Sequence, residues 1–439
     1  MSKKDKELRQ QVACEWLEQN YLNWGHLRHD IVTDRLQIRC ADSTGEEAIR
    51  RGGERQERWR NLTDKDINTM VCNCVAESQV NINLSEMWTA LKSDMVPSVH
   101  PIREWLDGLP PYTPDQPDWI DWLAQQVRVV DTTQSYSTST HLSSADLYWR
   151  QCFKKWFVAM VASWMKDEVV NHTVLVFVGR QGIFKTTWMD HLIPPALREY
   201  SSKLPLSGQI SKDDRLRLCE NAMLNIDELD AICGREMNIV KSLLTSTDVN
   251  ERAAYGRLKE RRVRLASFCA STNNREFLTD VTGNRRWLPF EVESIQNPFH
   301  ITLPYELIYA QAKALVESGR FIYWFDLEDI EQLEKHNEEF RAMENEEQLL
   351  PILFDVPAEG KGEFMTTAEI SDKLVTYGGI KKPMNTRQLG VLLGKMGYTK
   401  KKLHMSATSV RGWMVYERKT DEINLAKKSG TSGQADNIF

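Results

Sequence analysis

Short apolar runs alternate with amphipathic segments in the middle of the chain, between residues 174 and 274. Residues 174–178 form the unbroken run VLVFV, which is typical of a strand buried on both faces of a parallel sheet. Two further strand-like runs lie at 222–228 and 263–274, with the helical segment EMNIVKSLLT between them. Strands that alternate with helices predict an α/β sheet, whose ligands bind at the carboxyl ends of the strands.

The residues before this sheet predict mainly short helices, with turns and a few possible strands. In NLTDKDINTMVCNCV, Thr63 is placed to cap a helix together with Asp66, and in NLSEMWTALKSD the expected cap is Ser85. Four prolines between residues 109 and 119 predict a loop. The segment 149–167 is rich in Trp, Phe and Met, and we interpret it as a buried helix rather than as an aromatic binding surface.

The charge pattern changes after the sheet. Residues 326–347 carry ten acidic side chains against Lys335 and Arg341, which predicts a solvated acidic helix. Between residues 363 and 419 the balance reverses to eleven Lys or Arg against four Asp or Glu, a net charge of +7. A capped helix, an amphipathic helix and a hairpin follow one another there, in an order that fits a small winged-helix fold.

Composition sets limits on the class of protein. The net charge is −6, so the chain as a whole does not indicate a nucleic-acid partner. The N-terminus lacks the apolar core of a signal peptide, and no apolar run reaches the roughly 20 residues that span a bilayer. Of eight cysteines only Cys72 and Cys74 lie close together, which makes a poor zinc site. We therefore expect a soluble, cytoplasmic protein with reduced cysteines.

The segment GRQGIFKTT, residues 179–187, is close to the phosphate-binding pattern G-x-x-x-x-G-K-[ST]. A phosphate cradle needs inward backbone N–H groups, a lysine for the β- and γ-phosphates and a hydroxyl for Mg²⁺. Lys185 and Thr186 meet the last two needs directly after the predicted strand. The alternative is a chance Lys-Thr pair after a glycine-containing turn. The expected nucleotide-binding residues are Gly179, Gly182, Ile183, Phe184, Lys185, Thr186 and Thr187.

Phe184 departs from this pattern because a glycine usually precedes the lysine. We expect its backbone to stay in the normal helical region and its side chain to face away from the phosphates. On that expectation Phe184→Gly leaves ATP binding within about tenfold, or about 1.4 kcal/mol.

Three more elements at the strand ends complete a candidate ATPase site. An apolar run leads into Asp227 and Glu228, and Asp227 lies 42 residues after Lys185. A nucleotide hydrolase needs one acid near Mg²⁺ and one to activate water. Asn273 follows the next strand and is able to hold the γ-phosphate or the water. Arg285 and Arg286 precede another apolar segment, where an arginine near the γ-phosphate raises the rate by about 10³–10⁵. Alternatively they are a basic surface pair.

These elements together resemble the virulence-associated protein E family of P-loop ATPases, relatives of superfamily 3 helicases and of phage and viral primase-helicases. The resemblance rests on GRQGIFKTTW, LNIDELD, LLTSTDVNERAAYGR, ASTNNREFLTDVTGNRRWLPFEV and HPIREWLDGLP, and covers about residues 95–300. It implies a ring, expected to be a hexamer, in which Thr186 and Asp227 hold Mg²⁺, Glu228 activates water and Asn273 is the sensor. Arg285 or Arg286 then enters the neighbouring subunit's site.

The resemblance also implies a hairpin that points into the pore of such a ring and contacts nucleic acid. Six cations lie in the corresponding segment, with Tyr255 for stacking: Arg252, Arg257, Lys259, Arg261, Arg262 and Arg264. The alternatives are an exposed basic hairpin, or Arg252 and Arg257 serving the ATP site or the subunit contact. The residues expected on DNA are Arg257, Lys259, Arg261, Arg262, Arg387, Lys400 and Lys401. The winged-helix segment is equally able to dock a protein.

The changes in composition and the resemblance divide the chain into six segments. These are a mostly helical N-terminal domain (1–115), a helical collar or linker (116–170), the P-loop ATPase core of AAA+ or superfamily 3 type (171–300), an acidic helical connector (301–350), a basic winged-helix-like domain (360–420) and a disordered tail (421–439).

The expected function is an ATP-dependent DNA helicase or translocase of a mobile element or phage, acting in DNA replication on single-stranded or forked DNA. A separate chain would supply any primase. The alternative is an ATP-gated DNA-binding or scaffold protein with little unwinding, and a third is a P-loop regulator with a protein partner.

Overall fold

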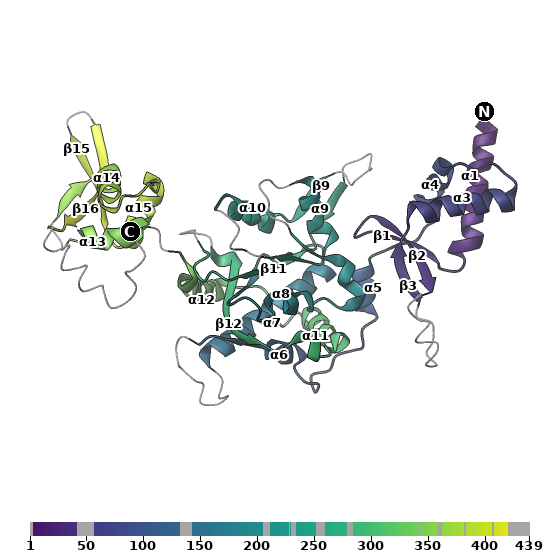
Figure 1. Ribbon diagram of the computed structural model, residues 1–439, viewed down its shortest axis with the longest axis horizontal. Helices are drawn as coiled ribbons and strands as arrows, with labels where there is room; N and C mark the ends of the chain where they lie inside the picture. The colour runs from purple at the N-terminus through teal and green to yellow at the C-terminus, as the bar shows by residue number, and fades with distance from the viewer. Residues whose placement is uncertain are drawn as a thin grey trace. The chain divides into compact units, whose positions relative to one another are not determined.

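The computed structural model describes residues 3–41, 57–131, 143–204, 211–227, 229, 234–251, 260–278, 284–342, 345–357, 362–381, 383–405 and 408–419. The chain divides into two compact units (Figure 1). One comprises Met1–Asn274 with Arg286–Glu331, and the other comprises Arg275–Arg285 with Gln332–Phe439. Both combine helices and strands, which confirms the mixed α/β class. The tail predicted to be disordered, 421–439, lies outside the described residues.

The first unit begins with helices packed on one face of a small sheet of order β3-β2-β1-β4. Its elements are α1 (Lys3–Leu17), β1 (Leu27–Asp30), β2 (Arg35–Ala41), β3 (Glu57–Asn61), α3 (Asp64–Ser78), α4 (Leu84–Leu91) and β4 (Ser98–Val99). Thr63 and Asp66 form the predicted capping box of α3. The predicted cap Ser85 is wrong, because Asn83 accepts from the amide of Glu86 and starts α4 earlier. The sheet itself was not predicted for a mostly helical segment.

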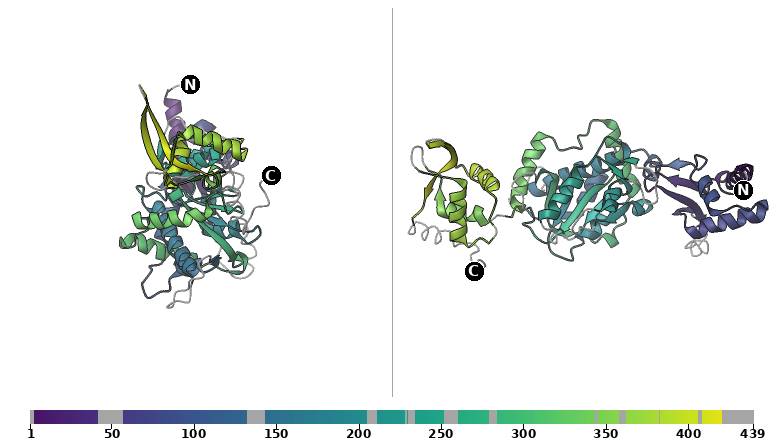
Figure 2. Two further views of the ribbon diagram at one scale, coloured as in Figure 1. Left: turned by 90° about the vertical axis from the view of Figure 1, so that its left-hand side faces the viewer. Right: turned by 90° about the horizontal axis from the view of Figure 1, so that it is seen from above.

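A six-stranded sheet forms the centre of the first unit, with the order β5-β12-β6-β11-β8-β7. Its strands are β5 (Val127–Val129), β6 (Val174–Val178), β7 (Ser201–Lys203), β8 (Met223–Ile226), β11 (Ser267–Thr272) and β12 (Trp287–Ile295). All neighbours pair in parallel except β5, which is antiparallel to β12. The predicted strand β6 lies between β12 and β11 with all five residues buried. The strands run side by side through the middle of the unit (Figure 2).

Helices cover this sheet and bury its aromatic side chains. The helix α7 (Ser144–Met165) packs with α6 (Trp119–Ala124) and α11 (Tyr305–Ser318) (Figure 1). Trp149 of α7 is fully buried, with ring centroids 5.5 Å from Phe177 and 5.0 Å from Phe290. The prediction of a buried aromatic helix is therefore confirmed. The helix α5 (Pro101–Asp107) lies before the irregular segment that the prolines predicted.

The predicted acidic helix is interrupted. The helix α12 (Leu327–Asn337) gives way to a 3₁₀ turn, Glu338–Phe340, and α13 (Asn345–Leu353) begins beyond it. Phe340 is buried at this turn, and Arg341 bonds to Glu338 and Glu347 at 2.8 and 2.5 Å. The acidic segment is therefore helical as predicted but is not one continuous helix, and Phe340 and Arg341 lie where α12 gives way to α13.

The second unit contains two helices followed by a hairpin, as predicted. Its remaining elements are β13 (Phe354–Asp355), β14 (Glu363–Met365), α14 (Thr367–Gly378), α15 (Thr386–Lys395), β15 (Thr399–Met405) and β16 (Thr408–Glu417). Thr366 and Glu369 cap α14, and Leu389, Leu392 and Leu393 bury one face of α15. They share a core with Trp413 of β16, so the hairpin and both helices pack as one small body (Figure 2). No helix in the described part of the chain is long and apolar enough to cross a membrane.

Candidate functional site

The turn after β6 brings the chain close to two neighbouring strands. Gly179 has φ +152°, and a Cβ on it would lie 2.9 Å from the carbonyl oxygen of Val292. Its amide donates to the carbonyl of Thr272 at 3.1 Å, beyond the end of β6. A side chain at position 179 would collide with the β12 backbone, so glycine is required here. Ile183 packs back onto this glycine, with its Cδ1 3.2 Å from the position of that Cβ.

Phe184 ends the turn, and α8 (Lys185–Asp190) begins with the next residue. Its dihedrals are φ +68° and ψ +18°, so the expectation of a normal helical backbone is wrong. This left-handed conformation costs a bulky L-residue about 1–2 kcal/mol. The turn therefore keeps the backbone that glycine favours, although a phenylalanine occupies the position. The Phe184 ring lies against Phe299, with centroids 6.5 Å apart at an interplanar angle of 79°.

The Lys185 ammonium lies in the concave side of the same turn. It donates to the carbonyls of Gly179 and Arg180 at 2.6 and 2.7 Å and to Oδ1 of Asn273 at 3.1 Å. Only 7% of the residue is exposed. The cation is thus fixed between the turn after β6 and the residue that follows β11. Two of the predicted site residues, Lys185 and Asn273, are in direct contact.

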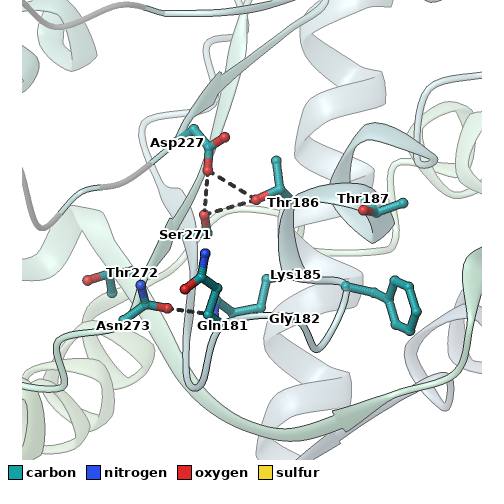
Figure 3. Close-up of a pocket in the computed structure, with 10 residues that line it drawn as sticks. Gln181, Gly182, Lys185, Thr186, Thr187, Asp227, Ser271, Thr272 and Asn273 are labelled. Atoms are coloured by element: carbon teal, nitrogen blue, oxygen red, sulfur yellow. Dashed lines mark hydrogen bonds between the residues drawn. The ribbon is translucent and has the colours of Figure 1, made fainter.

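Asp227, which follows β8, joins the same group of side chains. Its Oδ1 accepts from the hydroxyls of Thr186 and Ser271, each at 3.1 Å, and these hydroxyls lie 3.2 Å apart. Figure 3 shows the Asp227 carboxylate turned toward both hydroxyls. Burial on its own would raise the pKa of Asp227, but hydrogen bonds from Lys203, Ser271 and Thr186 outweigh it and lower the pKa. The carboxylate is therefore charged at neutral pH.

Two contributors to this group were missed as site residues. Lys203 of β7 pairs with Oδ2 of Asp227 at 2.7 Å, and Ser271 bonds to Oδ1. Ser271 belongs to the polar run STNN at the end of β11, and nothing in the sequence distinguishes it from its neighbours. Lys203 lies on a short edge strand whose sequence, SSK, has no strand pattern. Only the sheet order reveals that β7 is adjacent to β8.

These side chains surround a pocket of about 360 Å³ at the carboxyl ends of β6, β8 and β11. Five of the seven residues predicted for the phosphate loop line it, and Gly179 and Ile183 shape the turn behind it. The lining residues are Gln181, Gly182, Phe184, Lys185, Thr186, Thr187, Asp227, Ser271, Thr272 and Asn273. The pocket combines a buried cation, backbone at a helix start and a hydroxyl–carboxylate cluster, which suits a polyphosphate with a divalent cation.

The Thr186 hydroxyl and the Asp227 carboxylate are hard oxygen donors 3.1 Å apart, and this donor set fits Mg²⁺. Mg²⁺ is bound by one or two carboxylates together with phosphates and water, so it needs few protein ligands. Among the described residues, no group of three or more His, Cys, Asp or Glu side chains is arranged to hold a metal. Glu228, the predicted base, lies outside the described residues.

The predicted arginine pair lies on a 3₁₀ turn, Asn284–Arg286, directly before β12. Arg285 is exposed and Arg286 is partly buried. Burial lowers the pKa of Lys241 in α10 (Gly234–Thr245), and the charge of Arg286 lowers it further. Arg286 therefore lies near α10. Its entry into another subunit's site stays a prediction.

The predicted basic hairpin exists, but of the cations predicted there Arg262 is partly buried and Arg264 is fully buried. The strands β9 (Asp248–Glu251) and β10 (Glu260–Val263) pair antiparallel, and Arg257 and Lys259 lie outside the described residues. Arg261 is exposed, although it pairs with Asp248. Arg262 instead pairs with Glu220 at 3.0 Å and donates to the carbonyl of Val32. Both partners lie within the first unit, and contact of Arg262 with DNA stays a prediction.

Arg264 is fully buried and holds elements of the first unit together. Its guanidinium donates to carbonyls of Leu243 and Leu244 at the end of α10, and also to those of Asn171, Ser246 and Ala266. Counting it among the pore cations is wrong, because these carbonyls occupy its donors. The hairpin therefore offers fewer cations than its sequence suggests.

The remaining residues predicted for DNA contact lie on the second unit. Arg387 is exposed on the first turn of α15, and Lys400 and Lys401 are exposed on β15. The Lys400 ammonium lies 5.7 Å from the centroid of the Trp413 ring. The helix and the hairpin thus both carry cations at the surface of this unit.

The chain is similar to a known family and to solved structures of another protein. The model of the virulence-associated protein E-like domain matches residues 120–342. No curated protein matches the chain. An apo structure of the NrS-1 C-terminal region is similar over 89% of this chain and 96% of that chain, at 11% identity and a TM-score of 0.44. A second apo form of the same region gives 11% identity and a TM-score of 0.40. Similarity of this degree says nothing about the chemistry of the pocket.

Proposed function

The chain belongs to the virulence-associated protein E-like family, and from this premise we propose that it is a P-loop ATPase that moves on DNA. The observation that carries the proposal is the convergence of Lys185, Thr186, Asp227 and Asn273 on one pocket. These four residues come from three separate strand ends of one parallel sheet. Such an edge is where α/β proteins bind nucleotides.

Each residue of the pocket has a role in this proposal. Phosphate oxygens compete with the carbonyls of Gly179 and Arg180 for the Lys185 ammonium, and a charged acceptor is the stronger partner. The backbone N–H groups at the start of α8 face the same phosphates. Asn273, already bonded to Lys185, lies where it can contact the γ-phosphate.

Thr186 and Asp227 would hold Mg²⁺, and the charge of Asp227 at neutral pH supports this assignment. The metal, when bound, neutralises negative charge that develops on the transferred phosphoryl group. Lys203 pairs with the other oxygen of Asp227 and so keeps Oδ1 turned toward Thr186. Glu228, next along the chain, is the proposed base for the attacking water.

The motor is proposed to be a hexameric ring of a mobile element or phage, in which Arg285 or Arg286 completes the neighbouring pocket. The β9–β10 hairpin would face DNA through Arg261 and through Arg257 and Lys259. The order of α14, α15 and the β15–β16 hairpin supports a winged-helix fold for the second unit, with Arg387, Lys400 and Lys401 on duplex DNA.

Replacement of the phosphate-binding lysine tests the proposal. Lys185→Ala removes the cation that pairs with the β- and γ-phosphates, so DNA-stimulated ATP hydrolysis should fall at least about 100-fold, or about 2.7 kcal/mol. Lys65→Ala removes an exposed lysine of α3 and should leave the rate unchanged. Full DNA-stimulated hydrolysis by the Lys185→Ala protein would contradict the proposal.

The left-handed Phe184 favours a second candidate, an ATP-gated DNA-binding or scaffold protein with little unwinding. A bulky residue in a strained turn is able to support nucleotide binding while slowing turnover. Strand displacement on forked DNA, measured beside ATP hydrolysis, separates the two candidates. The motor displaces the strand in an ATP-dependent manner, whereas the scaffold binds DNA with ATP and displaces nothing.

A further inference from the structure

Phe299 is a large apolar side chain held out from the surface. It lies in the 3₁₀ turn Pro298–His300, and 70% of the residue is exposed. Pro298 is buried, and the amide of Phe299 donates to Oδ1 of Asn297 at 3.0 Å. The chain directly before the ring is therefore anchored. A ring that is fixed and exposed in this way is available to a planar ligand.

Two rings from the phosphate-loop region meet Phe299. The Phe184 centroid lies 6.5 Å away at 79°, and the His191 centroid lies 5.5 Å away at 89°. Neither contact is a parallel stack. With most of the Phe299 side chain exposed, a flat aromatic group is able to lie on it.

The group formed by Phe184, His191 and Phe299 adjoins the pocket. Phe184 and Thr187 line the pocket, and His191 Nδ1 bonds to the carbonyl oxygen of Thr187 at 2.7 Å. Tyr305 donates to the carbonyl of His191 at 2.7 Å and so fixes the end of α8. Figure 3 shows Thr187 on the side of Thr186 that is away from Asp227. Phe184 thus belongs both to the lining of the pocket and to the group of three rings, which adjoins the pocket at this residue.

We propose that Phe299, braced by Phe184 and His191, is the stacking surface for the base of the bound nucleoside triphosphate. The inference rests on the proposed function, since it takes the γ-phosphate to lie beside Asp227 and Lys185. The base then leaves the pocket past Thr187 and Phe184, toward Phe299. Aromatic stacking binds any base by its face.

The proposal gives a reason for the unusual residue of the loop. A glycine at position 184 would take the same backbone conformation without strain, but it would carry no ring to hold Phe299. Strained conformations persist where the surroundings and the function require them. Here the strain places an aromatic side chain between the phosphates and the base.

Calorimetric titration of the full chain with Mg-ATP and with Mg-tripolyphosphate tests the proposal, because the second ligand has no base. Phe299→Ala should weaken ATP about tenfold and leave tripolyphosphate within about twofold, and Phe299→Trp should restore ATP binding. Trp324→Ala, which removes another exposed aromatic of the same unit, should change neither affinity. Lys185→Ala should weaken both ligands.

The outcomes separate the two proposals. If Phe299→Ala binds ATP as tightly as the wild type, the base site is wrong while the phosphate site stands. If the wild type binds neither ligand, the proposed function itself fails. If Phe299→Ala loses ATP only together with a change in molecular mass by light scattering, Phe299 is a subunit contact, and the base site is again wrong.

Discussion

At the scale of single residues, Phe184 holds a backbone conformation that suits glycine better. The turn is set by its neighbours, since Gly179 needs close contact with β12 and Lys185 must begin α8. The pattern of glycines and the Lys-Thr pair predicted where the turn lies. It did not predict the dihedrals of Phe184, because these follow from the geometry of the whole turn.

Comparison of Phe184→Gly with Phe184→Ala isolates the strain, because both variants lose the ring. The glycine variant should be the more stable by about 1 kcal/mol, since only alanine keeps the left-handed cost. Thermal unfolding should show a midpoint about 1–3 °C higher for glycine than for alanine. Equal midpoints would mean that position 184 carries no strain. Phe184→Gly should still bind ATP within about tenfold, or about 1.4 kcal/mol.

Arg264 shows why some single residues are beyond prediction. A run of basic residues has the same sequence whether its side chains are exposed to solvent or buried. Arg264 turns inward because carbonyls from α10, from Asn171 and from Ala266 converge on it. These acceptors are backbone carbonyl oxygens, which every residue has, so the sequence does not reveal which of them lie close to Arg264.

At the scale of elements, helices and strands were predicted correctly where the sequence has a clear apolar pattern or a clear capping residue. Four of these elements lie where predicted: the strand VLVFV, the Thr63 cap, the capped helix α14 and the aromatic helix α7. The cap Ser85 was wrong because Asn83 lies two residues earlier and forms a capping box with Glu86, three residues further on. The N-terminal sheet was not predicted, although β2 alternates polar and apolar residues, because β1 and β3 are short and rich in charged residues.

The helix α5 depends on a histidine cap that is sensitive to pH. His100 Nδ1 accepts from the amide of Arg103 at 3.3 Å. Burial, with a smaller effect from Arg103, lowers the pKa of His100 to about 4, although Asp30 and Asp167 oppose the shift. The folded protein therefore keeps the ring neutral. In the unfolded chain His100 has a pKa of about 6.5, so it takes up a proton at a higher pH than in the folded protein.

It follows that His100 costs stability as the pH falls from about 6.5 toward 4, because the unfolded state binds more protons in that window. His100→Asn keeps a capping acceptor and removes the titration. Its thermal midpoint should therefore fall less between pH 7 and pH 5 than that of the wild type. Parallel curves for the two proteins would show that His100 does not titrate in this window.

At the scale of the whole molecule, the central sheet explains why distant motifs form one pocket. Lys185, Asp227 and Asn273 are far apart in sequence, but β6, β11 and β8 are adjacent and parallel. The sequence predicted that these strands share a carboxyl edge, and the pocket lies there. The contribution of Lys203 could not be predicted, because the place of β7 at the edge depends on the order of the strands.

The proposed motor needs nucleotide in this pocket and DNA within a ring of subunits. Particle images of the protein with an ATP analogue, Mg²⁺ and forked DNA examine both together. The predicted result is a closed ring around DNA, with the analogue's phosphates beside Lys185 and Thr186 and an arginine of the neighbouring subunit at each pocket. Nucleotide bound elsewhere, or no nucleotide in the pocket at saturating concentration, would contradict the proposal.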